Sequence, residues 1–238
     1  MAKLRQGKDF QPPATPPLSH HTIYTTVEAA MDEEERYLFE VQGYLHIPAA
    51  LDASELQRLN ASVDGSPQPP TPPAPGLLPQ LTDLLAWPRP LSEPFRELLD
   101  HPSIAPLLDE ILGEGHRLDM DPVAIVTEQG EAGGPLHGGG ADRASMVQSA
   151  FWHAGRFYTG MVVVEFFLAP EGPGDGGLGI IGGSHKAELQ LPASMAITGA
   201  PGSAEYAEAA AAGAQHRAVT EIHAAAGDAV IFAEACSQ

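Results

Sequence analysis

The segment Phe157–Lys186 constrains the fold of this chain more than any other stretch of the sequence. It begins with a long apolar run, Met161–Leu168, which predicts a buried strand. A turn rich in proline, glycine and aspartate follows at Pro170–Gly177, and a second, shorter apolar run covers Leu178–Ile181. The segment ends in a polar tip, Gly182–Lys186. We therefore expect two strands joined by a turn and followed by a loop that carries polar side chains.

The sequence on either side of this segment predicts helices first and strands later. The clearest local signal is a capping box, in which Asp52 is followed by Glu55 three residues later, and it predicts a helix from Ala53 to about Val63. The other expected elements are helices at Val27–Val41, Leu77–Ala86 and Leu91–Leu99, a helix between Pro102 and Gly113, a loose helical excursion at Gly199–Ala214, and strands at Tyr44–Ile47, Pro122–Thr127, Ala218–His223 and Ala229–Glu234. This order predicts an α+β fold with an antiparallel, barrel-like core.

The length and apolar content indicate one domain. Apolar residues make up 43% of the 238 residues, which is enough for a single core. We expect residues 27–238 to form this domain and residues 1–26 to form a flexible, proline-rich leader. The segment 65–76, GSPQPPTPPAPG, predicts an exposed proline-rich insertion within the domain.

The charge and the hydropathy pattern exclude several classes of protein. The formal net charge of −19 argues against binding to nucleic acid or to an anionic membrane, because few cations are present to neutralise phosphates. No run approaches the roughly 20 apolar residues of a membrane span, and the N-terminus has no apolar signal core. The single cysteine, Cys236, excludes an intrachain disulfide. We therefore expect a soluble, intracellular, cytoplasmic protein with a small-molecule partner, and the sequence leaves its oligomeric state open.

Three pieces of the sequence, taken in order, carry a resemblance to a known family. They are the lone histidine of PLHGGG at His137, the stretch Gly176–Lys186 with its GGSHK tip, and the strand GDAVIF at Gly227–Phe232. In this order they resemble the phytanoyl-CoA dioxygenase family of iron(II)/2-oxoglutarate oxygenases. The resemblance implies a double-stranded β-helix (a jelly-roll or cupin-like core) with N-terminal helices. It also implies Fe(II) as cofactor, 2-oxoglutarate as cosubstrate, and hydroxylation of a small or lipid-like substrate.

The first departure from the family pattern concerns the iron-binding carboxylate. Iron in such enzymes is held by two histidines and one carboxylate. His137 matches the first histidine, but Gly139 stands where the carboxylate is expected two residues later. In iron halogenases of similar fold, a small residue at this place leaves room for halide. Otherwise the acid comes from elsewhere, and the candidates are Asp142 and Glu165, a carboxylate inside an apolar strand that must be paired, solvated or functional.

The second departure concerns the distal histidine. Aligned on the GDAVIF strand, its position falls at Gln238 or one place beyond. The family's last strand, with the arginine that grips 2-oxoglutarate, has no counterpart in this sequence. The resemblance therefore implies an oxygenase domain that is incomplete, lacks its last strand and is inactive as given. The alternative is a non-catalytic pseudo-enzyme or binding scaffold of the same fold.

Four further side chains are candidates for binding cosubstrate or substrate. Tyr158 and Lys186 are candidates for contact with the carboxylates of 2-oxoglutarate. His153 and Arg156 precede the central strand and are candidates for substrate contacts.

The histidine of the GGSHK tip admits three interpretations: a structural residue, a residue that supports the metal site or contacts substrate, and a metal ligand. We expect His185 to be a structural, hydrogen-bonded residue, as the resemblance implies. A third hypothesis for the whole chain is a cupin-like module for another metal. It requires His137, His153 and His185 to converge at about 2.0–2.2 Å from one ion.

Overall fold

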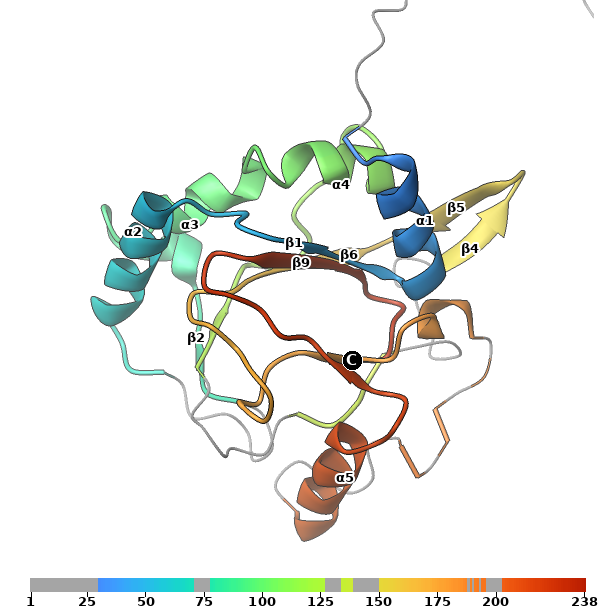
Figure 1. The fold of residues 1–238 in the computed structure, drawn as a ribbon. Coiled ribbons are helices and arrows are strands. Elements are labelled where there is room, and N and C mark those ends of the chain that lie inside the picture. Colours follow the sequence, from blue (N-terminus) through green and yellow to red (C-terminus); the bar gives the residue numbers. More distant parts are fainter. Residues whose placement is uncertain are drawn as a thin grey trace, which may run out of the picture.

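The computed structural model describes most of the chain and arranges it as helices packed around small antiparallel sheets (Figure 1). The described residues are 30–70, 78–126, 134–138, 150–187 and 203–238, with Leu189, Leu191, Pro192, Ser194 and Met195. The expected leader 1–26, Gly139, Asp142 and the second half of the insertion 65–76 lie outside the described residues.

The helical elements are α1 (Glu33–Gln42), α2 (Ala53–Asp64), η1 (Leu84–Ala86), α3 (Glu93–Glu97), η2 (Leu98–Asp100), α4 (Ala105–Leu112), η4 (Ser184–Lys186) and α5 (Ala204–Ala214), where η marks a 3-10 turn. The strands are β1 (Tyr44–Ile47), β2 (Gln80–Leu81), β3 (Ala124–Ile125), β4 (Ala150–His153), β5 (Arg156–Thr159), β6 (Val162–Phe166), β7 (Gly179–Ile180), β8 (Thr220–Glu221) and β9 (Ala229–Ala233). None of the helices in this described part is long and apolar enough to span a membrane.

The centre of the molecule is a three-stranded antiparallel sheet in the order β1-β9-β6. Strand β9 is buried along its whole length, since β1 and β6 pair on its two sides and the sheet is covered on both faces. Side chains of a strand alternate between the two faces, and residues that pair directly share a face. Glu165 pairs with Val230, and His46 pairs with Val230 from the other side. These three side chains therefore share one face of the sheet, which we call the inner face.

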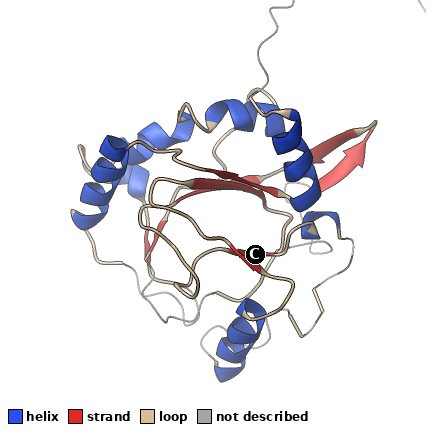
Figure 2. Ribbon diagram, viewed as in Figure 1, coloured by secondary structure: helices blue, strands red, loops and turns tan. Residues whose placement is uncertain are grey.

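The N-terminal helices cover the opposite face of this sheet (Figures 1 and 2). Leu45 and Ile231, which lie on that face, pack with Phe39 of α1 and Ile104 at the start of α4 in one apolar cluster. The ring of Phe166 meets the ring of His101 edge-on at 6.2 Å between centroids. The helices thus cover the face of the sheet opposite to the inner face. The inner face is turned toward the C-terminal half of the chain.

Local capping chemistry fixes the two longer N-terminal helices. In α2, Asp52 accepts hydrogen bonds from the backbone N–H groups of Ser54 and Glu55, and Glu55 accepts one in return from the N–H of Asp52. The predicted capping box and the helix that follows it are therefore confirmed. Helix α1 has the same box at Asp32 and ends at Gly43.

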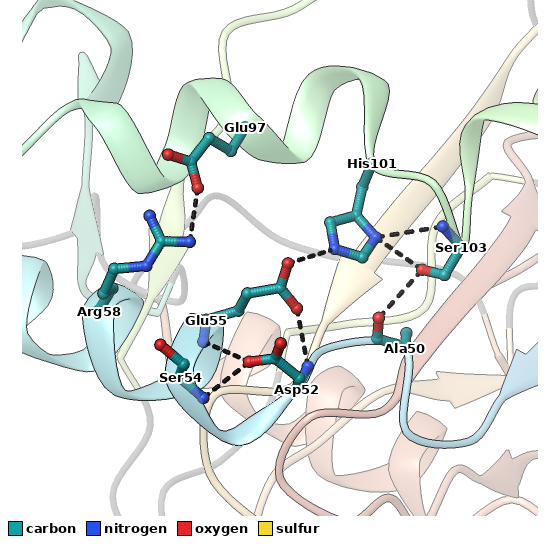
Figure 3. Close-up of polar contacts among 8 residues, drawn as sticks. All are labelled: Ala50, Asp52, Ser54, Glu55, Arg58, Glu97, His101 and Ser103. Carbon is teal, nitrogen blue, oxygen red and sulfur yellow. Dashed lines mark hydrogen bonds and ion pairs between the residues drawn. The ribbon is translucent and has the colours of Figure 1, made fainter.

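The capping box of α2 also ties this helix to the segment before α4 (Figure 3). Nε2 of His101 lies 3.1 Å from Oε1 of Glu55, and Nδ1 lies 2.7 Å from the hydroxyl of Ser103. That hydroxyl donates to the carbonyl oxygen of Ala50. Because Glu55 uses its other oxygen for the helix cap, one carboxylate holds two elements together.

A second, smaller layer of backbone pairing faces the inner face of the sheet (Figure 2). It consists of the β7–β8 pair and of two bridges made by Ser237, one to Gly138 and one to Ile181. Strands β4 and β5 form a separate hairpin that projects beside α1 (Figure 1). The segment around His137 and the C-terminal residues therefore lie in the same layer.

The prediction of a helix at Leu77–Ala86 is wrong. Gln80 and Leu81 form β2, which pairs with β3, and only Leu84–Ala86 make a 3-10 turn. Asp83 has a φ of +57°, a left-handed backbone conformation that interrupts any helix.

Two other boundaries also differ from the expectation. The helix expected at Val27–Val41 begins only after Asp32, because the side chain of Asp32 caps the first turn there. The strand expected at Pro122–Thr127 is reduced to β3, and it is not buried, since Ile125 is 50% exposed.

Asp228, the acid of the GDAVIF strand, holds together the turns at one end of the sheet. Its carboxylate accepts hydrogen bonds from the backbone N–H groups of Ala49 and Ala225 and lies 2.9 Å from Nε2 of His46. Burial, the largest single influence, would raise the pKa of Asp228, but these hydrogen bonds outweigh it and hold the pKa below its usual range. The aspartate therefore acts as a charged acceptor for three donors.

We expect Asp228→Asn to lower the free energy of unfolding by about 2 kcal/mol, because the new amide meets donors with an N–H group of its own. Urea unfolding at pH 7 measures this loss. Asp121→Asn, at an exposed position, is the matched control and should change stability by less than about 0.5 kcal/mol. Equal stabilities of the two variants would contradict the role given to Asp228.

Candidate functional site

His137 lies directly opposite Gln238 in the second layer. The N–H of His137 donates to the carbonyl oxygen of Gln238 at 2.8 Å, and the N–H of Gln238 donates to the carbonyl oxygen of His137 at 3.0 Å. Residues that exchange both hydrogen bonds across an antiparallel pair project their side chains on the same side, with Cβ atoms about 5 Å apart. The structure therefore brings the first candidate ligand next to the position expected for the distal one.

The imidazole of His137 is held in one tautomer. Its Nδ1 lies 3.2 Å from the carbonyl oxygen of Pro135. A carbonyl oxygen can only accept, so Nδ1 carries a proton and donates, and in the neutral ring the lone pair lies on Nε2. The ring is exposed, whereas Pro135 and Leu136 before it are buried. His137 could thus offer Nε2 to a ligand.

Gln238 presents a neutral carboxamide beside this imidazole. Its Oε1 atom is buried and finds no hydrogen-bond partner among the described residues. An amide oxygen is a hard, neutral metal ligand. It suits cations that prefer oxygen ligands, such as Ca²⁺ or Mg²⁺, better than the iron(II) of a two-histidine site. The pair His137–Gln238 therefore supplies one imidazole where the resemblance expects two.

The described residues do not fit the expected iron site. No group of three or more histidine, cysteine, aspartate or glutamate side chains among them lies close enough together to hold a metal ion. His137 and Glu165 are therefore not members of such a group, and Asp142 lies outside the described residues. The hypothesis that His137, His153 and His185 converge on one metal is wrong, since all three are described and form no such group.

Glu165 lies on the inner face of the central sheet, opposite Val230. None of the side-chain hydrogen bonds and ion pairs found in the described part of the chain involves its carboxyl group. Burial raises the pKa of Glu165 to about 7, and the nearby carboxylate of Glu171 adds to the rise. A carboxyl group in this state is half protonated near neutral pH.

Glu171 is a residue that the sequence analysis missed. Burial raises the pKa of its carboxyl group; a hydrogen bond from the backbone N–H of Leu178 opposes this rise, and Asp175 adds to it. Its Oε2 atom is buried without a partner among the described residues, and its side chain lies over Gly177, where a Cβ atom would overlap it. The glycine of the PGDGG turn was the available signal, because it marks a close approach of another group to the backbone.

Neither of the two residues proposed for 2-oxoglutarate belongs to the central sheet. The ammonium of Lys186 donates to the carbonyl oxygen of Val41 at 2.6 Å, near the C-terminal end of α1. Tyr158 lies on the β4–β5 hairpin, where its ring stacks on Phe151. The structure therefore gives each of them a partner other than the expected cosubstrate.

The two residues proposed for substrate contact come together on the same hairpin. His153 pairs with Arg156 across the turn between β4 and β5. The guanidinium of Arg156 lies over the ring of Tyr158, 5.4 Å from its centroid. Three of the predicted site residues thus share one face of a hairpin.

His185 of the GGSHK tip is buried between α1 and the C-terminal segment. Its Nε2 lies 3.2 Å from the carbonyl oxygen of Glu40, its Nδ1 lies 3.6 Å from Sγ of Cys236, and its ring meets Phe157 edge-on. Burial lowers the pKa of His185 and keeps the ring neutral, although the hydrogen bond to Glu40 opposes this effect. These contacts agree with the structural, hydrogen-bonded role expected for this residue.

Cys236 is equally inaccessible. Burial raises the pKa of its thiol to about 11, so the thiolate is absent at neutral pH. We therefore assign no nucleophilic chemistry to the Cys236–His185 pair.

The sequence matches the family model for phytanoyl-CoA dioxygenase (PhyH) over residues 39–236. It matches no curated protein.

Several solved structures have a similar fold. HygX from Streptomyces hygroscopicus, with nickel, 2-oxoglutarate and hygromycin B bound, aligns with a TM-score of 0.68 and 20% identity over 87% of this chain and 79% of HygX. The epimerase SnoN, in complex with Fe³⁺, alpha ketoglutarate and nogalamycin RO, aligns with a TM-score of 0.56 and 21% identity over 86% of this chain and 75% of SnoN. AviO1 from Streptomyces viridochromogenes Tue57 aligns with a TM-score of 0.52 and 18% identity over 86% of this chain and 84% of AviO1. At these identities the likeness establishes the fold.

Proposed function

The chain belongs to the phytanoyl-CoA dioxygenase family, and on this premise we propose that it keeps the fold of an iron(II)/2-oxoglutarate oxygenase without assembling a working iron site. Iron or nickel and 2-oxoglutarate are the groups bound in the related structures. The part of the chain that the structure describes does not bring together two histidines and one carboxylate for iron. We therefore expect no turnover of 2-oxoglutarate by the 238-residue chain.

Two facing layers of strands support a double-stranded β-helix as the core of this fold. The central sheet β1-β9-β6 forms one layer. The β7–β8 pair and the bridges of Ser237 to Gly138 and Ile181 belong to the other. His137, and Gln238 at the position that the resemblance gives to the distal ligand, pair with each other in this second layer.

The observation that carries the proposal is this reciprocal pairing of His137 with Gln238. It places a carboxamide, which cannot act as the second imidazole, beside the one histidine of the site. A non-catalytic scaffold that binds a small molecule is the second candidate function. The ligands of related structures, hygromycin B for HygX and nogalamycin RO for SnoN, support a small molecule as the bound partner.

The test is to restore the missing ligands. We expect the double variant Gly139→Asp/Gln238→His to bind Co(II), a spectroscopic substitute for Fe(II), at least about 100-fold more tightly than the unmodified chain. The loss of one supporting residue around a metal already costs about 10–100-fold in affinity, and this variant gains two direct ligands. Titration followed by visible absorption under anaerobic conditions measures the affinity, and succinate release measures turnover with Fe(II).

The control is His137→Ala in the same double variant, which should abolish the gained affinity. Succinate formation by the unmodified chain that disappears with His137→Ala would overturn the proposal that the site is incomplete. A double variant with no gain in affinity would overturn the placement of Gln238 at the distal position.

A further inference from the structure

The β4–β5 hairpin presents an exposed face made of aromatic and basic side chains. Directly paired residues share a face of the hairpin, so its two faces follow from the register. One face carries Ala150, Phe157 and Thr159, which are buried, and Trp152. The other face, which we call the outer hairpin face, carries Phe151, His153, Arg156 and Tyr158, and all four are exposed. The hairpin is thus anchored by one face and offers the other to solvent.

The aromatic residues of the outer hairpin face are already arranged as a stack. The rings of Phe151 and Tyr158 lie 5.5 Å apart and within 15° of parallel, and the guanidinium of Arg156 lies over the ring of Tyr158. Phe151 and Tyr158 remain 47% and 38% exposed, so this arrangement does little for the core. Because the stack is already formed at the surface, its side chains lose less conformational entropy when a ligand binds, and a planar ring can join it beside Phe151.

The outer hairpin face carries basic side chains, whereas the chain as a whole is strongly acidic. The hairpin Ala150–Thr159 contains no acidic residue, whereas the whole chain has 31 acidic residues against 12 lysines and arginines. The side-chain hydrogen bonds and ion pairs found among the described residues do not involve His153 or Arg156. The guanidinium of Arg156 and the imidazole of His153 carry N–H groups that can donate to an anion, which the acidic remainder of the surface would repel.

The size of the face indicates a small molecule as its occupant. Four side chains form the whole face, whereas a stable interface between proteins uses about 20–30 residues on each side. The aromatic pair and the basic pair are two residues apart along the strands, a spacing of roughly 7 Å. A ligand that uses both pairs would carry its acidic group about this far from the centre of its ring.

We propose that the outer hairpin face is a binding site for planar aromatic anions, such as an arene that bears a carboxylate or sulfonate. This site is separate from the His137–Gln238 pair and does not depend on whether a metal binds there. His153 and Arg156 hold the acidic group, and Phe151 with Tyr158 stacks on the ring.

The test uses 8-anilinonaphthalene-1-sulfonate, a planar aromatic anion whose fluorescence rises on binding. We expect Arg156→Gln to weaken its binding about fivefold and Phe151→Ser/Tyr158→Ser to weaken it about tenfold, because a cation–π contact and a stacked ring are each worth roughly that factor. Arg117→Gln and Met120→Ser are matched controls, since Arg117 and Met120 are also exposed but lie far along the chain from the hairpin. Far-ultraviolet circular dichroism and melting temperature confirm that each variant is folded.

N-phenyl-1-naphthylamine, which lacks the sulfonate, separates charge from apolar contact. We expect it to bind at least about fivefold more weakly than the sulfonate to the unmodified chain, and to be insensitive to Arg156→Gln. Equal affinity for the two probes would overturn the proposal. So would hairpin variants that bind the sulfonate as the controls do. A concentration-dependent dimer that the Phe151→Ser/Tyr158→Ser variant abolishes would instead make this face a contact between copies, and would also overturn it.

Discussion

Replacing Gly43 with alanine should lower the free energy of unfolding by about 4 kcal/mol. Gly43 ends α1 with a φ of +85°, a conformation that costs a residue with a side chain about 1–2 kcal/mol. An added Cβ atom would also overlap Nδ1 of His185 and Sγ of Cys236, both of which are fully buried. Overpacking of a tight core costs about 1–3 kcal/mol more. The ring of His185 cannot move aside, because Glu40 and Phe157 hold it on its other sides.

A second glycine can separate the cost of the backbone conformation from the cost of the overlapping Cβ atom. Gly115 has a φ of +83° and no atom within 4 Å of an added Cβ, so Gly115→Ala should cost only the backbone part, about 1–2 kcal/mol. Urea unfolding of both variants gives the difference. Adding Cys236→Ala to Gly43→Ala should recover part of the loss by removing one overlapping atom. Equal costs at Gly43 and Gly115 would show that the contact with the GGSHK tip is not as close as the structure has it.

The elements that could be predicted from the sequence are those fixed by local chemistry. The capping box at Asp52 and Glu55 needs only residues three apart, and its helix was placed within one residue at its end. The helix expected at Leu77–Ala86 failed because Gln80–Leu81 pairs with β3, a partner more than 40 residues away. Apolar spacing alone cannot reveal such a partner, and a two-residue strand leaves no clear periodicity.

For the candidate site, too, the sequence could predict what depends on local residues but not what depends on contacts between distant segments. The family resemblance implied a distal ligand at Gln238 or one place beyond, to act together with His137. The carboxylate of Glu165 within an apolar run could also be noticed without a structure. The hairpin of Tyr158 and Arg156 was missed, although Ala154–Gly155 between two aromatic, alternating runs is a signal for a two-residue turn. Both turn residues have positive φ, as such a turn requires. The position of Glu171 over Gly177 depends on tertiary packing, and the turn sequence could only have indicated that some group comes close.

Glu165→Gln should stabilise the metal-free protein at pH 8 by up to about 3 kcal/mol. The folded protein raises the pKa of this carboxyl group from 4.5 to about 7, so the folded state binds its proton more tightly than the unfolded state does. Each pKa unit corresponds to about 1.4 kcal/mol. The stabilisation that comes from this tighter proton binding is complete below the pKa that Glu165 has in the unfolded chain. It is lost as the pH rises through the pKa that Glu165 has in the folded protein. Stability of the unmodified chain should therefore fall between pH 5 and pH 8 at this site.

Glutamine has nearly the shape of protonated glutamate and carries no charge at any pH, so the variant should lack this part of the pH dependence. Urea unfolding from pH 5 to pH 8 with EDTA present gives both curves, and Glu114→Gln, at an exposed position, is the control. Glu171→Gln should give a smaller change in the same direction, because it removes the like charge that helps to raise the pKa of Glu165. Parallel curves for the unmodified chain and Glu165→Gln would mean that the carboxylate is well solvated. Glu165 would then face water, and the inner face of the central sheet would not be the enclosed, low-dielectric surface that its neighbours Val230 and Val163 indicate.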